Sequence, residues 1–125
     1  MSALTNHQVY KLLTVNTAPE RATRLVAKLA ADVRGDFQIV HCGNAEKIEH
    51  VRPLVMEHRP DLMFCASMWS PEESAEIKKI ARDVLPQLRC FAVPQGMQVQ
   101  HGPEYTVEYV KSKLRDVIEG DLGLE

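Results

Sequence analysis

His41 and Cys42 are the adjacent pair whose residue types most suggest chemistry in this sequence of 125 residues. A thiolate beside a histidine can act as a nucleophile, and both side chains can bind Zn²⁺. Successive residues of a strand point to opposite faces of a sheet, so these two side chains cannot easily touch. Cys42 would then need another base, for which His101 is the candidate. We expect Cys42 to be a small buried residue, and a cysteine-dependent enzyme at Cys42 is the third of three functional hypotheses.

A metal site built from His41, His101 and Cys42 is conceivable, but no carboxylate completes it and no ligand spacing marks it. The three cysteines are widely spaced and odd in number, which does not suggest a disulfide framework or a zinc knuckle. We therefore predict no bound metal and no cofactor. A reducing compartment, the cytoplasm, is the expected location.

Polar but uncharged side chains gather where the apolar segments end, which is where ligands bind in open α/β sheets. The candidate ligand or interface residues are Asn16, Thr17, His41, Cys42, Ser67, Trp69, Ser70, Gln95 and His101. No Asp, Glu, Lys or Arg stands at the immediate strand ends. An uncharged or aromatic small molecule is the second functional hypothesis, and its expected contacts are Asn16, His41, Ser67, Trp69 and Gln95.

Phosphate and nucleotide binding are not expected. The sequence contains neither a GxGxxG nor a GxxxxGK[ST] loop. Glu20, Glu72 and Glu73 fall in the first turns of predicted helices, where their carboxylates take up the positive end of the helix dipole. An anion would be repelled there.

The apolar pattern alternates between strand-like and helix-like segments. The strand-like segments are residues 9–15, 37–42, 62–68 and 90–93, and Gly43-Asn44 is interpreted as a turn. Short connections between alternating strands and helices predict a parallel sheet with helices on both faces. We expect a three-layer α/β sandwich of four strands in the order 2-1-3-4, with a short fifth strand if the alternating residues 97–100 (MQVQ) also pair.

Two capping boxes are predicted at helix starts, from Thr17 to Glu20 and from Ser70 to Glu73. Trp69 precedes the second box, where a hydrophobic residue commonly packs on the fourth helical position. That position is occupied by a polar residue, Ser74, so Trp69 needs cover from the neighbouring loop, a ligand or another chain.

The stretches KLLTVNTAPE (11–20) and RPDLMFCASMWSP (59–71) resemble the first and third strand regions of response-regulator receiver domains, which have a flavodoxin-like fold. Receivers follow the first strand with an acidic pair that holds Mg²⁺, and here those places are Asn16 and Thr17. The place of the phosphoacceptor aspartate is Ala66. Receivers carry Lys-Pro after the last strand, whereas the comparable stretch GMQVQHGP contains no lysine. The resemblance therefore implies a receiver-like domain without the phosphorylation residues, a pseudo-receiver.

Composition limits the classes of partner. The formal net charge of −2 gives no basic field that would attract nucleic acid or an anionic membrane. The longest apolar runs are far shorter than the roughly 20 residues that span a bilayer. We expect residues 1–120 to form one domain and residues 121–125 a frayed acidic tail.

The leading hypothesis is a non-catalytic regulatory or protein-interaction module that acts through a homodimer or another protein partner. The absence of charged residues at the strand ends and the missing local partner of Trp69 motivate it. This hypothesis needs no catalytic activity, whereas the third hypothesis, an enzyme at Cys42, stays open as an alternative.

Overall fold

Four parallel strands form the centre of the molecule. The computed structural model describes residues 9–119, and the expected tail at residues 121–125 lies outside them. The strands are β1 (Val9–Val15), β2 (Gln38–Ala45), β3 (Leu62–Cys65) and β4 (Arg89–Ala92). Their order in the sheet is β2-β1-β3-β4, which confirms the expected order 2-1-3-4.

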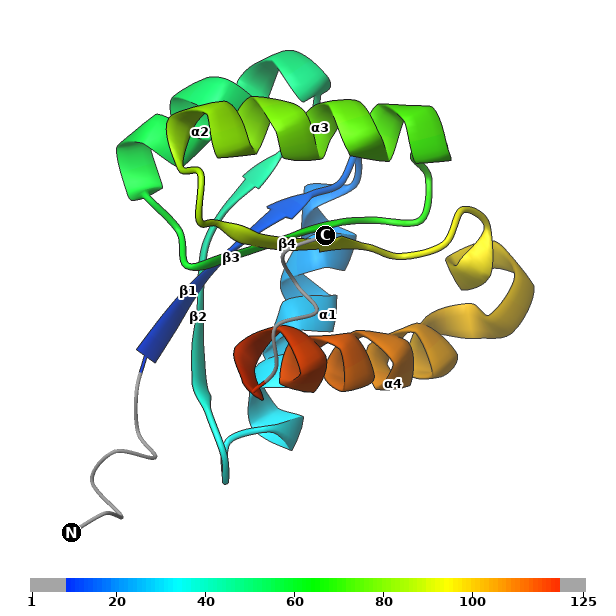
Figure 1. Cartoon of the computed structure of the whole chain (residues 1–125). Coiled ribbons are helices and arrows are strands. Elements are labelled where there is room, and N and C mark those ends of the chain that lie inside the picture. Colours follow the sequence, from blue (N-terminus) through cyan, green and yellow to red (C-terminus); the bar gives the residue numbers. More distant parts are fainter. Residues whose placement is uncertain (1–8, 120–125) are drawn as a thin grey trace, which may run out of the picture.

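Helices cover both faces of the sheet (Figure 1). They are α1 (Pro19–Asp32), the 3₁₀ turn η2 (Ile48–His50), α2 (Val51–His58), α3 (Pro71–Val84) and α4 (Met97–Glu119). One apolar cluster lies between the sheet and the α1–α4 layer, and the other lies between the sheet and the α2–α3 layer. Because alternate residues of β1 enter the two clusters, Leu12 packs toward α1 and α4 while Leu13 packs toward α2 and α3. The three-layer sandwich is confirmed.

Strand β2 is longer than the pattern indicated, and the turn expected at Gly43-Asn44 is wrong. Those two residues pair with Leu13 and Thr14 of β1. The register skips one residue at Cys42, which is a β-bulge that lets the strand continue. Asn44 therefore lies within the sheet, where its side chain can reach the end of β1.

The predicted fifth strand at residues 97–100 is also wrong, because this segment is helical. The helix α4 contains a break at Gly102, whose φ of 86° lies in the left-handed region that glycine adopts without a steric penalty. Pro103 then starts the longer piece, which buries Val107, Val110 and Leu114 against the sheet. Within residues 9–119 the sheet consequently ends at β4.

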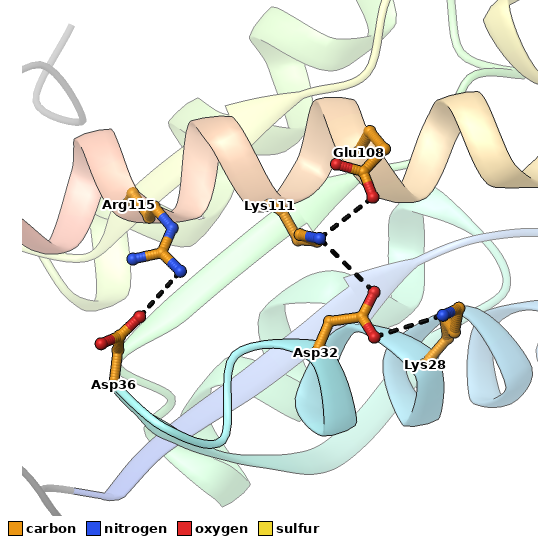
Figure 2. A network of polar contacts seen from close by, with 6 residues as sticks. All are labelled: Lys28, Asp32, Asp36, Glu108, Lys111 and Arg115. Carbon is orange, nitrogen blue, oxygen red and sulfur yellow. Dashed lines mark hydrogen bonds and ion pairs between the residues drawn. The ribbon is translucent and has the colours of Figure 1, made fainter.

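A network of ion pairs joins α4 to α1 (Figure 2). Through Arg115 and Asp36 it also joins α4 to the turn that follows α1. Lys111 Nζ lies 3.6 Å from Asp32 Oδ2 and 3.0 Å from Glu108 Oε2, while Lys28 Nζ lies 3.2 Å from Asp32 Oδ1. The hydrogen bond from Lys28 is the main reason that the pKa of Asp32 is lowered. Such exposed pairs contribute little stability singly, but here they connect two helices that pack on the same face.

The two predicted capping boxes have different outcomes. Glu73 N donates to Ser70 Oγ at 3.1 Å and Ser70 N donates to Glu73 Oε1 at 2.9 Å, so the second box is confirmed. The first box is wrong, because α1 has Ala18 at its N-cap and no side-chain cap. Asn16 Oδ1 instead accepts the Ala18 N–H at 2.7 Å.

This difference gives a matched pair of substitutions. Ser70→Ala is expected to lower the free energy of unfolding by about 1–2 kcal/mol, because the Glu73 N–H loses its acceptor. Thr17→Ala is the control and should change it by less than about 0.5 kcal/mol. Urea denaturation followed by circular dichroism measures both. Equal effects of the two substitutions would contradict the assignment of the caps.

Candidate functional site

The corner where β1 and β3 end is closed. Asn16 and Ser67 are 4% and 9% exposed, and Ala66, which directly follows β3, is 8% exposed. Gln98 and Thr106 of α4 are among the residues that surround the remaining space, a cavity of about 10 Å³. That volume is at the lower limit for one water molecule. The small-molecule site expected at the strand ends thus has no cavity of ligand size at this corner.

A chain of hydrogen bonds crosses the ends of β1 and β2. His41 Nε2 lies 2.8 Å from Thr14 Oγ1, and Thr14 Oγ1 donates to Asn44 Oδ1 at 2.7 Å. Asn44 Nδ2 in turn donates to the Asn16 carbonyl at 3.0 Å. These two contacts fix the orientation of the Asn44 amide. The Thr14 hydroxyl has a single proton, which it donates to Asn44. His41 Nε2 must therefore carry the proton of the hydrogen bond between His41 and Thr14. The chain fixes two strand ends to each other.

His41 is half-buried, and this burial lowers the pKa of its imidazole. The neutral ring with a protonated Nε2 is therefore favoured, in agreement with the hydrogen bond to Thr14. The sequence did not indicate Thr14 as a site residue, although the alternation of β1 could have placed it on the face of Leu12. Asn44 was expected at the end of the second strand, but in a turn and not inside the sheet, so its contacts with β1 were not foreseen.

Thr14 is the centre of this chain, so removing its hydroxyl should destabilise the fold. Thr14→Val keeps the shape of the side chain and leaves Asn44 Oδ1 and His41 Nε2 without their partner. The free energy of unfolding is expected to fall by about 1–3 kcal/mol in urea denaturation. The exposed Thr23 serves as the control, because Thr23→Val should remain within about 0.5 kcal/mol of the wild type. A similar loss for both variants would argue against the chain.

Cys42 and His41 are on opposite faces of the sheet. His41 contacts Thr14, whereas Cys42 packs against the apolar cluster beneath α2 and α3. Cys42 Sγ lies 3.5 Å from the Leu12 carbonyl, and burial raises the pKa of its thiol. A raised pKa lowers the thiolate fraction near neutral pH, so these surroundings do not activate Cys42 as a nucleophile.

The thiols should consequently react slowly in the folded protein. Burial raises the pKa of Cys65 to about 12 and that of Cys90 to about 11. With iodoacetamide at about pH 8, we expect slow alkylation of Cys42 and none of Cys65 or Cys90, and three adducts once urea unfolds the chain. Mass spectrometry counts the adducts. Alkylation of Cys42 faster than that of a free thiol with a pKa of ~8.5 would restore the cysteine-enzyme hypothesis.

The cover that Trp69 needs comes from the fold itself. Its side chain is 9% exposed and belongs to the apolar cluster between the sheet and the α2–α3 layer. The indole Nε1–H donates to the Val15 carbonyl at 2.8 Å. Trp69 therefore stabilises the fold. Because its side chain is already buried within the chain, it gives no argument for a partner protein at this residue.

The remaining candidate residues do not converge on one point. Thr17, Gln95 and His101 are exposed, and Ser70 is engaged as the N-cap of α3. The His101 ring stacks on Tyr105 with 4.5 Å between ring centroids. Within residues 9–119, no group of three or more His, Cys, Asp or Glu side chains is arranged to hold a metal ion. Nor is any helix of that range long and apolar enough to cross a membrane.

The open space lies to one side of the closed corner. A cleft of about 520 Å³ runs between α3 and the end of β4, and Trp69 and Gln95 are the two predicted site residues that line it. Its other walls come from Ala75 and Lys78 of α3 and from Ala92 of β4. This cleft extends from Pro94 and Gln95, which follow β4, along α3 to Arg82.

No protein-family model matches the chain, and no curated protein matches it as a relative. Among solved structures, the response regulator domain of CheB from Thermotoga maritima is similar in fold. The TM-score is 0.56 at 15% sequence identity, and the alignment covers 90% of this chain and 95% of that domain. The chain is thus an α/β protein with the flavodoxin-like arrangement seen in a receiver domain, and at this identity the similarity concerns the fold alone.

Proposed function

We propose that this protein is a non-catalytic regulatory module with a receiver-like fold, which acts through contacts with a partner protein or a second copy of itself. The closed corner carries this proposal. By the resemblance to receivers, Ala66 would correspond to the phosphoacceptor, and Asn16 and Thr17 would correspond to the metal-binding acids. Without carboxylates, this corner offers neither ligands for Mg²⁺ nor an acceptor for a phosphoryl group. Regulation by such a domain would then depend on its surfaces.

A cleft on the surface supports the same proposal. It has a volume of about 520 Å³, lies between α3 and the end of β4, and includes the apolar side chains of Ala75 and Ala92. A surface cleft with apolar walls is a feature that protein segments bind. The cysteines, which form no disulfide within the described residues, fit a reducing compartment, and we propose the cytoplasm.

Two measurements test this function. Incubation with acetyl phosphate and Mg²⁺ should leave the intact mass of the protein unchanged, because the corner has no phosphoacceptor. Light scattering after size-exclusion chromatography should show a mass of twice 14.1 kDa, or pull-down should retain a partner. A phosphorylated product would contradict the proposal. A strict monomer that retains no partner would contradict it as well.

A further inference from the structure

A hollow of about 280 Å³ lies between α1 and α4, which cover the same face of the sheet (Figure 1). Its wall on α1 comes from Arg21, Arg24, Leu25 and Lys28, and this spacing places the four residues along one side of the helix. Its wall on α4 comes from both pieces of that helix, which meet at the break at Gly102. Small-molecule pockets begin at roughly 300 Å³, so the hollow suits a small ligand.

The floor of the hollow is apolar. Val107 is 5% exposed and belongs to the apolar cluster between the sheet and the α1–α4 layer, and Leu25 packs against the same cluster. The exposed Pro103 adds a third apolar surface. A ligand with an apolar body would remove these surfaces from water, which favours binding.

Two of the three cations around the hollow are free to meet a ligand. Lys28 pairs with Asp32 at 3.2 Å, in the network that also holds Lys111 (Figure 2). The side chains of Arg21 and Arg24 are exposed, and they make no hydrogen bond or ion pair with any other residue of the described range. A guanidinium group presents paired N–H donors that match the two oxygens of a carboxylate. The two arginines therefore favour an anionic group on the ligand.

Glu104 limits how negative that group can be. It lies on the α4 side of the hollow and forms no ion pair with either free arginine. Two positive charges and one negative charge leave a single positive charge for the ligand to neutralise. A monocarboxylate supplies one negative charge, whereas a phosphate group carries about two near neutral pH and would be repelled more strongly by Glu104.

We propose that this hollow binds a small monocarboxylate with an apolar body. The body would lie on Leu25, Pro103 and Val107, and the carboxylate would accept hydrogen bonds from Arg21 and Arg24. The hollow adjoins the closed corner, because Arg21 and Leu25 also line the small cavity there. This inference goes beyond the proposed function and does not depend on it.

Three probes test the proposal, which are 3-phenylpropionate, its uncharged amide and acetate. In NMR titrations of the full chain near neutral pH, 3-phenylpropionate is expected to bind at least about tenfold more tightly than either of the others. The amide lacks the charge that Arg21 and Arg24 attract, and acetate lacks the apolar body. The methyl resonances of Leu25 and Val107 should shift with 3-phenylpropionate. Higher salt should weaken the binding.

Three variants locate the binding. Arg21→Gln and Arg24→Gln should each weaken binding of 3-phenylpropionate at least about fivefold, because each removes a charged donor. Glu104→Gln should strengthen it about twofold or more, because the acid that opposes the ligand is removed. The control Arg34→Gln removes an exposed charge in the turn after α1, outside the hollow, and should leave the affinity unchanged. Circular dichroism verifies that each variant is folded.

Equal binding of 3-phenylpropionate and its amide, or an unchanged affinity in both arginine variants, overturns the proposal. Inorganic phosphate that binds more tightly than 3-phenylpropionate would assign the two arginines to a phosphate group. Loss of a dimer or of a protein partner in the double variant of Arg21 and Arg24 would assign the hollow to a protein contact. Either result also overturns the proposal. A strict monomer without a partner that still binds 3-phenylpropionate would refute the proposed function and leave this site standing.

Discussion

Trp69→Ala is expected to lower the free energy of unfolding by about 3–5 kcal/mol, the range for removing a large aromatic side chain from a core. Trp69 is only 9% exposed and packs in the cluster beneath α2 and α3. The substitution leaves a void between the loop before α3 and the end of β1. Urea denaturation followed by circular dichroism measures the loss, since Trp69 is the single tryptophan and its fluorescence disappears with it.

Trp69→Phe separates packing from hydrogen bonding. The Val15 carbonyl accepts from Trp69 Nε1 and also from the Ala66 N–H at 3.0 Å, so it keeps one partner when the indole is lost. The phenylalanine variant should therefore lose only about 0.5–1.5 kcal/mol from the missing hydrogen bond, in addition to the smaller ring. Val99→Ala is the control, because Val99 is 90% exposed and should contribute less than about 0.5 kcal/mol. A Trp69→Ala effect as small as that of Val99→Ala would mean that Trp69 is a surface residue.

Local patterns predicted the sheet well, because burial on both faces leaves a direct trace in composition. Residues 62–65 are apolar without interruption, and they form the central strand β3 with every side chain buried. The cap at Ser70 was predictable for a similar reason, since all of its hydrogen bonds lie within four residues. Features determined by residues close in sequence were thus the accessible ones.

The predictions failed where a short sequence pattern is compatible with two local structures. Thr17 and Glu20 have the spacing of a capping box, but Asn16 takes the Ala18 N–H and the helix starts one residue later. Residues 97–100 alternate in polarity, yet Met97 is buried and Val99 is 90% exposed, so the alternation did not reflect a pleated strand. Four residues are too few to distinguish the two periods.

The candidate site was harder to predict, because its contacts are distant in sequence. Trp69 donates to a carbonyl 54 residues away, and His41 reaches Thr14 across 27 residues. The sequence could identify these polar side chains, but it could not show that their hydrogen bonds are made within the fold. What the sequence did indicate is the uncharged character of the residues directly after β1 and β3, and the function proposed for the chain depends on that character.

Ala66→Asp introduces a carboxylate at the place where the resemblance to receivers puts the phosphoacceptor, and it should destabilise the protein without making it a substrate for phosphorylation. Ala66 is 8% exposed beside a cavity of about 10 Å³, so the added carboxylate has little water around it. The free energy of unfolding at neutral pH is expected to fall by at least about 2 kcal/mol. Acetyl phosphate with Mg²⁺ should give no phosphate adduct, because Asn16 and Thr17 supply no carboxylate for the metal ion.

The dependence of this loss on pH identifies its cause. Desolvation raises the pKa of a buried carboxyl above the unfolded value of roughly 3.9, so the unfolded chain releases the proton first as pH rises. The destabilisation of Ala66→Asp should therefore be small at acidic pH and increase as pH rises through the folded pKa. Ala66→Asn is the control of similar size, and its loss should not vary with pH. A phosphate adduct on Ala66→Asp would show that the corner still accepts a phosphoryl group, and it would contradict the view that regulation depends on the surfaces of this fold.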